Sequence, residues 1–129
     1  MDVLVSDQRL HGAKTPASTI TLESGQTTVR ELIRCRVRQE VERHNQNLPE
    51  TYRGLVQPEE SEQILNGFRM NTRRPLDWEA QFRSACSSFE TNGFLVLVDG
   101  LQVTGLDDPL EVQPGSEVEF LKLVPLVGG

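Results

Sequence analysis

The chain has 129 residues, a net charge of −6 and an isoelectric point near 4.9. This length favours one domain that buries its own core without metals or disulfides. The acidic balance argues against a nucleic-acid partner, because phosphate binding requires clustered lysine and arginine side chains. It is compatible with solubility and with a basic protein partner.

The apolar segments and the cysteines narrow the class further. The longest apolar run, residues 94–98, is too short to cross a bilayer, and the first residues lack the pattern of a signal peptide. We therefore expect a cytoplasmic protein with no membrane partner. Cys35 and Cys86 fall within predicted helices and lack metal-site spacing. We expect two buried free thiols, no metal and no cofactor.

The first elements along the chain are a predicted hairpin and a long helix. Residues 2–9 and 19–23 are rich in strand formers, and the glycine, proline and small polar residues between them indicate a turn. Thr28 with Glu31 forms a capping box, in which each side chain satisfies the other's backbone donor. Helical spacing carries this helix to about His44. The spaced apolar residues are Val29, Leu32, Ile33, Val37 and Val41.

Five arginines lie on that helix. Arg30, Arg34 and Arg38 recur every four residues and therefore share one face. Arg36 and Arg43 are also expected to lie on a solvated part of the helix. A solvated helix face is favoured over a binding patch.

Residues 46–93 contain two further predicted helices. Residues 58–65 resemble a short helix, with proline and acids in the first turn and Asn66-Gly67 after it. Residues 77–90 form the second, with an apolar stripe expected to pack in the core. If part of that stripe is exposed, it marks a surface for a partner or for self-association. The stripe consists of Trp78, Phe82, Ala85, Cys86 and Phe89.

The last third is predicted to be extended. Residues 94–98 indicate a central strand covered on both faces, and Asp99-Gly100 is a strong hairpin turn. A returning strand, an edge strand, a turn and a final strand are predicted at 101–103, 108–112, 113–116 and 117–124. The order predicts an α+β fold with helices on one face of the sheet, in which the first and last strands pair at its centre.

Several segments resemble the MoaD and ThiS sulfur carriers, which are ubiquitin-like proteins. The Pro114-Gly115-Ser116 turn feeds the last strand, and a proline-containing apolar tail ends in Gly-Gly. Thr27 to Leu32 is similar to the motif that opens the helix of that family. The resemblance covers residues 1–45 and 94–129. It implies one domain over 1–129: a β-grasp mixed sheet with one main helix packed on it and a helical insertion at about 46–93.

The insertion departs from the compact carriers. In this respect the chain is more like the ubiquitin-like proteins encoded beside activation enzymes in bacterial operons. That resemblance implies a protein modifier whose terminal glycine is adenylated by an activating enzyme of the ubiquitin or MoeB type. The acyl group then passes through a thioester to an amine of a target protein. A conjugating enzyme and a deconjugating protease are further implied partners.

The tail supplies the predicted site. Gly128 and Gly129 are the sites of adenylation and conjugation, because residues without Cβ can thread a narrow channel. Pro125 restricts the start of the tail, and Leu126 and Val127 offer apolar contacts for docking the activating enzyme. We assign no catalytic residue and expect no enzyme activity. Catalysis would belong to the partner, with this chain as its substrate.

Three alternatives accompany this hypothesis. The apolar tail favours a carrier that bears a C-terminal thiocarboxylate for sulfur transfer. A non-conjugated interaction module could self-assemble through its insertion or its edge strands. Gly128-Gly129 could also be a frayed end without a role.

Two further observations bear on reactivity. Cys35 and His44 lie on opposite faces of the predicted helix and cannot pair as nucleophile and base. Only two lysines, Lys14 and Lys122, accompany eleven arginines. Because a guanidinium does not readily attack an acyl group, few lysines would limit self-conjugation. A GC-rich genome would also explain this ratio.

Overall fold

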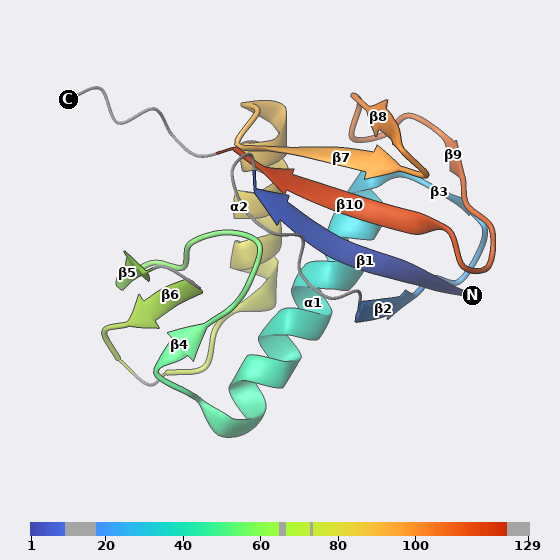
Figure 1. Ribbon diagram of the computed structural model, residues 1–129. Helices are drawn as coiled ribbons and strands as arrows, with labels where there is room; N and C mark the ends of the chain where they lie inside the picture. Colours follow the sequence, from blue (N-terminus) through green and yellow to red (C-terminus); the bar gives the residue numbers. More distant parts are fainter. Residues whose placement is uncertain (10–17, 65–66, 73, 124–129) are drawn as a thin grey trace.

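The computed structural model describes residues 1–9, 18–64, 67–72 and 74–123. Its main feature is a five-stranded sheet in the order β2-β1-β10-β7-β8 (Figure 1). The strands are β1 (Asp2–Arg9), β2 (Ser18–Thr21), β7 (Phe94–Val98), β8 (Leu101–Val103) and β10 (Glu117–Lys122). The predicted α+β class with a mixed sheet is confirmed.

The first and last strands of the sheet pair at its centre. β1 runs parallel to β10, with Leu4 opposite Glu117 and Arg9 opposite Lys122. β10 also pairs antiparallel with β7, where Lys122 lies opposite Phe94. The predicted central pairing is therefore confirmed. It holds the end of β10 between two neighbouring strands.

Both predicted hairpins form. β1 pairs antiparallel with β2, and β7 pairs antiparallel with β8. Asp99 and Gly100 have φ values of 48° and 84°, which suit the two central residues of a type I′ turn. The turn predicted between β1 and β2 lies almost wholly outside the described residues.

The main helix, α1 (Val29–Asn47), begins where the capping pattern predicts. The Thr28 hydroxyl accepts a hydrogen bond from the Glu31 N–H at 3.2 Å, which satisfies a free donor of the first turn. The helix extends beyond the predicted end at His44. It stops at Leu48, whose φ of 45° is left-handed and cannot continue an α-helix.

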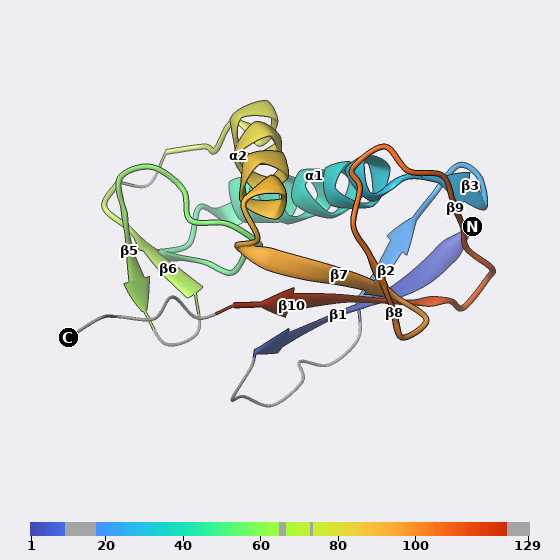
Figure 2. The ribbon, with the colours of Figure 1, turned by 90° about the horizontal axis from the view of Figure 1, so that it is seen from above.

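The core lies between α1 and one face of the sheet. Both helices cover that face (Figure 2). In β7, Phe94, Val96 and Val98 are buried, while Leu95 and Leu97 are half-buried. The expectation that this strand is covered on both faces is therefore wrong in the described part, since the helices lie on one side only. Fully buried members of the core include Val3, Val29, Leu32, Ile33, Val96, Val118 and Phe120.

A small second sheet lies next to the start of α1. β3 (Gln26–Thr27) pairs antiparallel with β9 (Leu110–Glu111). The N–H of Val112 donates to the carbonyl of Gly25 at 2.8 Å and extends this pairing. The predicted strand at 108–112 thus forms, although its partner is β3 and not an edge of the five-stranded sheet.

Residues 46–93, which the sequence predicts to be a helical insertion and which we call the inserted segment, contain a three-stranded sheet that the sequence did not predict. Its strands are β4 (Thr51–Tyr52), β5 (Ser61–Ile64) and β6 (Gly67–Met70), in the order β4-β6-β5. The predicted helix at residues 58–65 is wrong. Glu60 has a left-handed φ of 54°, and the residues after it pair with β6. Proline and acidic residues mark a tight turn here, a role that suits them as well as a helix start.

The second helix, α2 (Trp78–Glu90), confirms the prediction for residues 77–90. Asp77 is its N-cap and accepts a hydrogen bond from the Glu79 N–H at 3.1 Å. Within its apolar stripe, Ala85, Cys86 and Phe89 are buried, while Trp78 and Phe82 are only half-buried. Neither helix in the described ranges combines the length and apolar character needed to cross a bilayer.

Specific contacts attach the inserted segment to the helices. The Asn45 side chain forms two hydrogen bonds with the backbone of Leu76, at 2.8 and 2.9 Å. His44 meets the ring of Tyr52 edge-on at 5.2 Å. Gln81 donates to the Val56 carbonyl at 3.3 Å. The three-stranded sheet therefore lies at the end of the molecule where β1 and β10 end (Figures 1 and 2).

Gly54 permits the chain to pass over the buried ring of Tyr52. A Cβ at this position would overlap that ring. We therefore expect Gly54→Ala to lower the free energy of unfolding by about 1–3 kcal/mol through overpacking, measured by urea denaturation. Arg53→Ala, at the exposed neighbouring position, is the matched control and should change it by less than about 0.5 kcal/mol. Equal effects of both variants would contradict the steric explanation.

Candidate functional site

The predicted site residues, Pro125, Leu126, Val127, Gly128 and Gly129, lie outside the described residues. The structure instead describes the segment from which they follow, Lys122 and Leu123, which we call the tail root. The N–H of Leu123 donates to the carbonyl of Gly93 at 3.3 Å. Lys122 ends β10 between β1 and β7. The tail root is thus held by backbone pairing.

Four charged side chains gather beside the tail root, and we call them the charge cluster: Asp7 of β1, Arg36 and Glu40 of α1, and Lys122 of β10. Arg36 binds both carboxylate oxygens of Asp7, with 2.7 Å between Nη2 and Oδ2. Its Nε donates to Glu40 Oε1 at 3.2 Å. This two-pronged contact matches the planar guanidinium to a carboxylate, which a lysine could not reproduce.

Arg36 is buried, with 6% of its surface exposed. Its guanidinium carbon lies 4.4 Å from the ring centroid of Phe120, a distance at which a cation is attracted to an aromatic face. The expectation that Arg36 belongs to a solvated face is therefore wrong. The helical spacing of the sequence could have indicated this burial, because position 36 lies between Ile33 and Val37 on the buried face of the helix.

Lys122 links the cluster to the inserted segment. Its ammonium lies 3.6 Å from Asp7 Oδ2 and donates to the carbonyl of Gly54 at 3.2 Å. Because β1, α1, β10 and the loop after β4 all contribute, the cluster joins the inserted segment to the sheet at the end of the last strand. Two cationic side chains and two carboxyl side chains meet within it, so each buried polar group has a partner.

The pKa values of the two carboxyl groups shift in opposite directions. Burial alone would raise the pKa of Asp7, but hydrogen bonds and the charges of Arg36 and Lys122 outweigh it, so this pKa lies below 3.8. Burial is the dominant influence on Glu40 and raises its pKa above the ordinary value despite Arg36. The fold therefore favours ionised Asp7 and disfavours ionised Glu40.

A groove of about 460 Å³ lies between α1 and α2 and is lined by Trp78, Phe82 and arginines of both helices. The guanidinium carbons of Arg34 and Arg38 lie 5.7 and 5.3 Å from the Trp78 ring centroid. Arg30 instead pairs with Asp107 at 2.7 Å. The exposure predicted for these three arginines is confirmed. Arg34 and Arg38 also cover an aromatic ring, and their charges are balanced by neighbouring acids, including Glu31 and Glu42.

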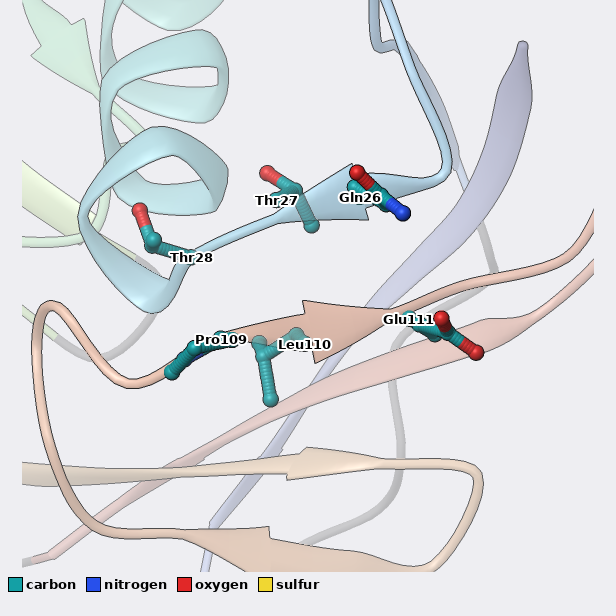
Figure 3. Close-up of a pocket in the computed structure, with 6 residues that line it drawn as sticks. All are labelled: Gln26, Thr27, Thr28, Pro109, Leu110 and Glu111. Atoms are coloured by element: carbon teal, nitrogen blue, oxygen red, sulfur yellow. The ribbon is translucent and has the colours of Figure 1, made fainter.

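A second pocket, of about 460 Å³, lies at the small β3–β9 sheet (Figure 3). The Thr28 hydroxyl in its lining is engaged in capping α1. The Oγ1 atom of Thr27 is buried without a hydrogen-bond partner. Among the described residues of the lining, Glu111 is the one with a charged side chain. These residues offer polar contacts but do not pair a nucleophile with a base.

The two cysteines and His44 are wholly or partly buried. Burial, with the nearby charge and hydrogen bond of Glu31, raises the pKa of Cys35 to about 11. Burial also raises the pKa of Cys86 and lowers that of His44. Cys86 is buried as predicted, whereas Cys35 is half-buried. Within the described ranges, no group of three His, Cys, Asp or Glu residues could hold a metal ion.

Comparison of the chain with protein-family models, with curated proteins and with solved structures finds no match.

The opposite pKa shifts predict unequal effects of neutralising the two carboxylates. Asp7→Asn should lower the free energy of unfolding at pH 7 by about 1–3 kcal/mol, because it leaves Arg36 partly unpaired. Glu40→Gln should reduce it less, since the amide oxygen can still accept from Arg36 and a disfavoured charge is removed. Urea denaturation of both variants and the wild type measures the difference. A larger loss for Glu40→Gln would contradict the assignment.

The same pKa shifts determine how the stability of the fold depends on pH. Because the folded-state pKa of Asp7 is depressed, its contribution is present above 3.8 and is lost as the pH falls through the folded value. The stability gap between wild type and Asp7→Asn should therefore shrink below pH 3.8. A gap that persists unchanged through acid would show that ionisation of Asp7 is not its source.

Proposed function

We propose that the chain is a ubiquitin-like protein modifier with the β-grasp fold. In this proposal an activating enzyme adenylates Gly129, and the acyl group passes through a thioester to an amine of a target protein. The chain supplies the substrate, and the catalytic groups belong to its partners.

The observation that carries the proposal is the strand order. A first hairpin, a helix across one face and a last strand paired in parallel with the first support the β-grasp arrangement that we propose. In that arrangement the last strand runs in the centre of the sheet and leads directly to the tail. The tail of the chain, which resembles that of the sulfur carriers, adds support from the sequence.

The tail root also supports an acyl-donor role. Lys122 is held by the charge cluster, and Leu123 is hydrogen-bonded to Gly93. A fixed starting point reduces the conformational freedom that an enzyme must restrict when it binds the following residues. Two glycines at the reacting end avoid a Cβ near the adenylating centre. Pro125, Leu126 and Val127 would then provide the apolar contacts for docking.

A sulfur carrier is the second candidate. The apolar composition of residues 125–127 favours it, because the carriers that this tail resembles share such a sequence. The two functions use the same activation step and differ in the group that receives the acyl chain. In the modifier this group is an amine, and in the carrier it is sulfur.

Deletion of Gly128-Gly129 tests both candidates. The protein is incubated with ATP and an activating enzyme of the ubiquitin or MoeB type, and the products are followed by non-reducing gels and intact mass. We expect the wild type to form a thiol-sensitive adduct, or to exchange one oxygen for sulfur if it is a carrier. The deletion should abolish both products, because the terminal carboxylate then belongs to Val127, two residues short of the adenylating centre and with a Cβ beside it.

Leu101→Ala serves as the control. Leu101 is 75% exposed and pairs with Val98, at the end of the sheet away from Lys122. It should support activation like the wild type. If the deletion variant is activated to the same extent as this control, the modifier and carrier proposals both fail. A non-conjugated interaction module then becomes the better explanation.

A further inference from the structure

The proposed chemistry makes every primary amine of the chain a competing acceptor. In aminolysis the lone pair of an amine attacks the acyl carbon, a C–N bond forms, and the C–S bond of the thioester breaks. The thiolate leaves, and the amine proton passes to solvent base. A protonated ammonium has no lone pair and does not react. An interaction that keeps an amine in its charged form therefore protects the amine from acylation.

Lys122 is the lysine closest in sequence to Gly129, seven residues before it (129 − 122). Two reacting groups joined by so short a segment meet at a high effective concentration. Without a protecting interaction, this side chain would be the first internal competitor for an activated tail. Lys14, the other lysine, lies far away in the sequence.

The structure engages the Lys122 ammonium on two sides. It donates to the Gly54 carbonyl at 3.2 Å and lies 3.6 Å from Asp7 Oδ2. One quarter of the side chain is exposed. A carboxylate and a carbonyl acceptor both stabilise the charged ammonium. The position on the strand matters as well, because Lys122 points to the face that α1 covers, while Leu121 before it points to the opposite face.

The amine of Met1 is engaged in a similar way. It donates to the carbonyl of Leu22 at 2.9 Å and is partly buried. Both amines that the structure describes are thus bound to acceptors within the fold.

We infer that the fold withholds Lys122 from acylation, so that an activated tail is not consumed by the nearest amine of its own chain. The charge cluster thereby acts as a selectivity device that directs the acyl group to a partner. This inference rests on the proposed acyl-donor function and assigns to Asp7 and to the Gly54 carbonyl the role of positioning groups.

The test uses the full chain carrying a C-terminal thioester, which is generated by intein cleavage with a small thiol. Lys14→Arg is the parent, so that Lys122 is the one remaining lysine. The matched variant adds Leu121→Lys and Lys122→Arg. It moves the amine by one residue to the other face of β10 and keeps a cation beside Asp7. Intact mass separates hydrolysis from amide formation, and peptide mapping locates the amide.

We expect the parent to lose its thioester by hydrolysis, with little amide at Lys122. The variant with the displaced amine should form the amide about tenfold faster, which corresponds to about 1.4 kcal/mol of lost protection. Asp7→Asn in the parent should increase amide formation at Lys122 itself. Circular dichroism establishes that each variant is folded before its rate is compared.

Two outcomes would overturn the inference. Amide formation at Lys122 of the parent, as fast as in the displaced variant, would show that the ammonium is not withheld. If the variant with the displaced amine is equally unreactive, the distance between the tail and the amine, and not the charge cluster, protects the chain. Because the thioester is installed chemically, failure of enzymatic activation would refute the proposed function without deciding this test.

Discussion

The parallel pairing of β1 with β10 is the constraint on which the rest of the fold depends. Parallel neighbours cannot be joined by a tight turn, so the intervening chain must cross over the sheet. α1 makes that crossing and covers one face, and β7 and β8 complete the far side. The pairing also commits the end of the last strand to the centre of the sheet, with a neighbouring strand on each side.

Burial of Arg36 follows from that arrangement. The helix crosses above the ends of β1 and β10, where Asp7 and Lys122 point inward. The buried guanidinium of Arg36 requires carboxylate partners, because an uncompensated buried charge is strongly destabilising. Asp7 and Glu40 meet this requirement, and Phe120 supplies an aromatic surface. The charge cluster thus packs beneath α1 and also holds Lys122, the residue at the end of β10.

The inserted segment adds a further contact to this cluster. Without the segment after α1, the ammonium at the end of β10 would keep its contact with Asp7 but would lack the backbone acceptor at Gly54. Here the loop after β4 brings the carbonyl of Gly54 to Lys122, and Tyr52 packs against His44 beneath it. The same segment adds α2, whose half-buried Trp78 is bracketed by Arg34 and Arg38. The inserted segment therefore contacts the residue from which the tail follows.

Local patterns in the sequence determined the elements whose signals lie close together along the chain. Thr28 starts α1, Asp77 starts α2, and Asp99-Gly100 turns the hairpin, since capping and turn formation involve neighbouring residues. The proposed tail chemistry likewise comes from the sequence. Only the tertiary structure decided that residues 61–64 form a strand and that Arg36 and Lys122 share a carboxylate. Those outcomes depend on partners distant in sequence, whose pairing energy overrides local preference.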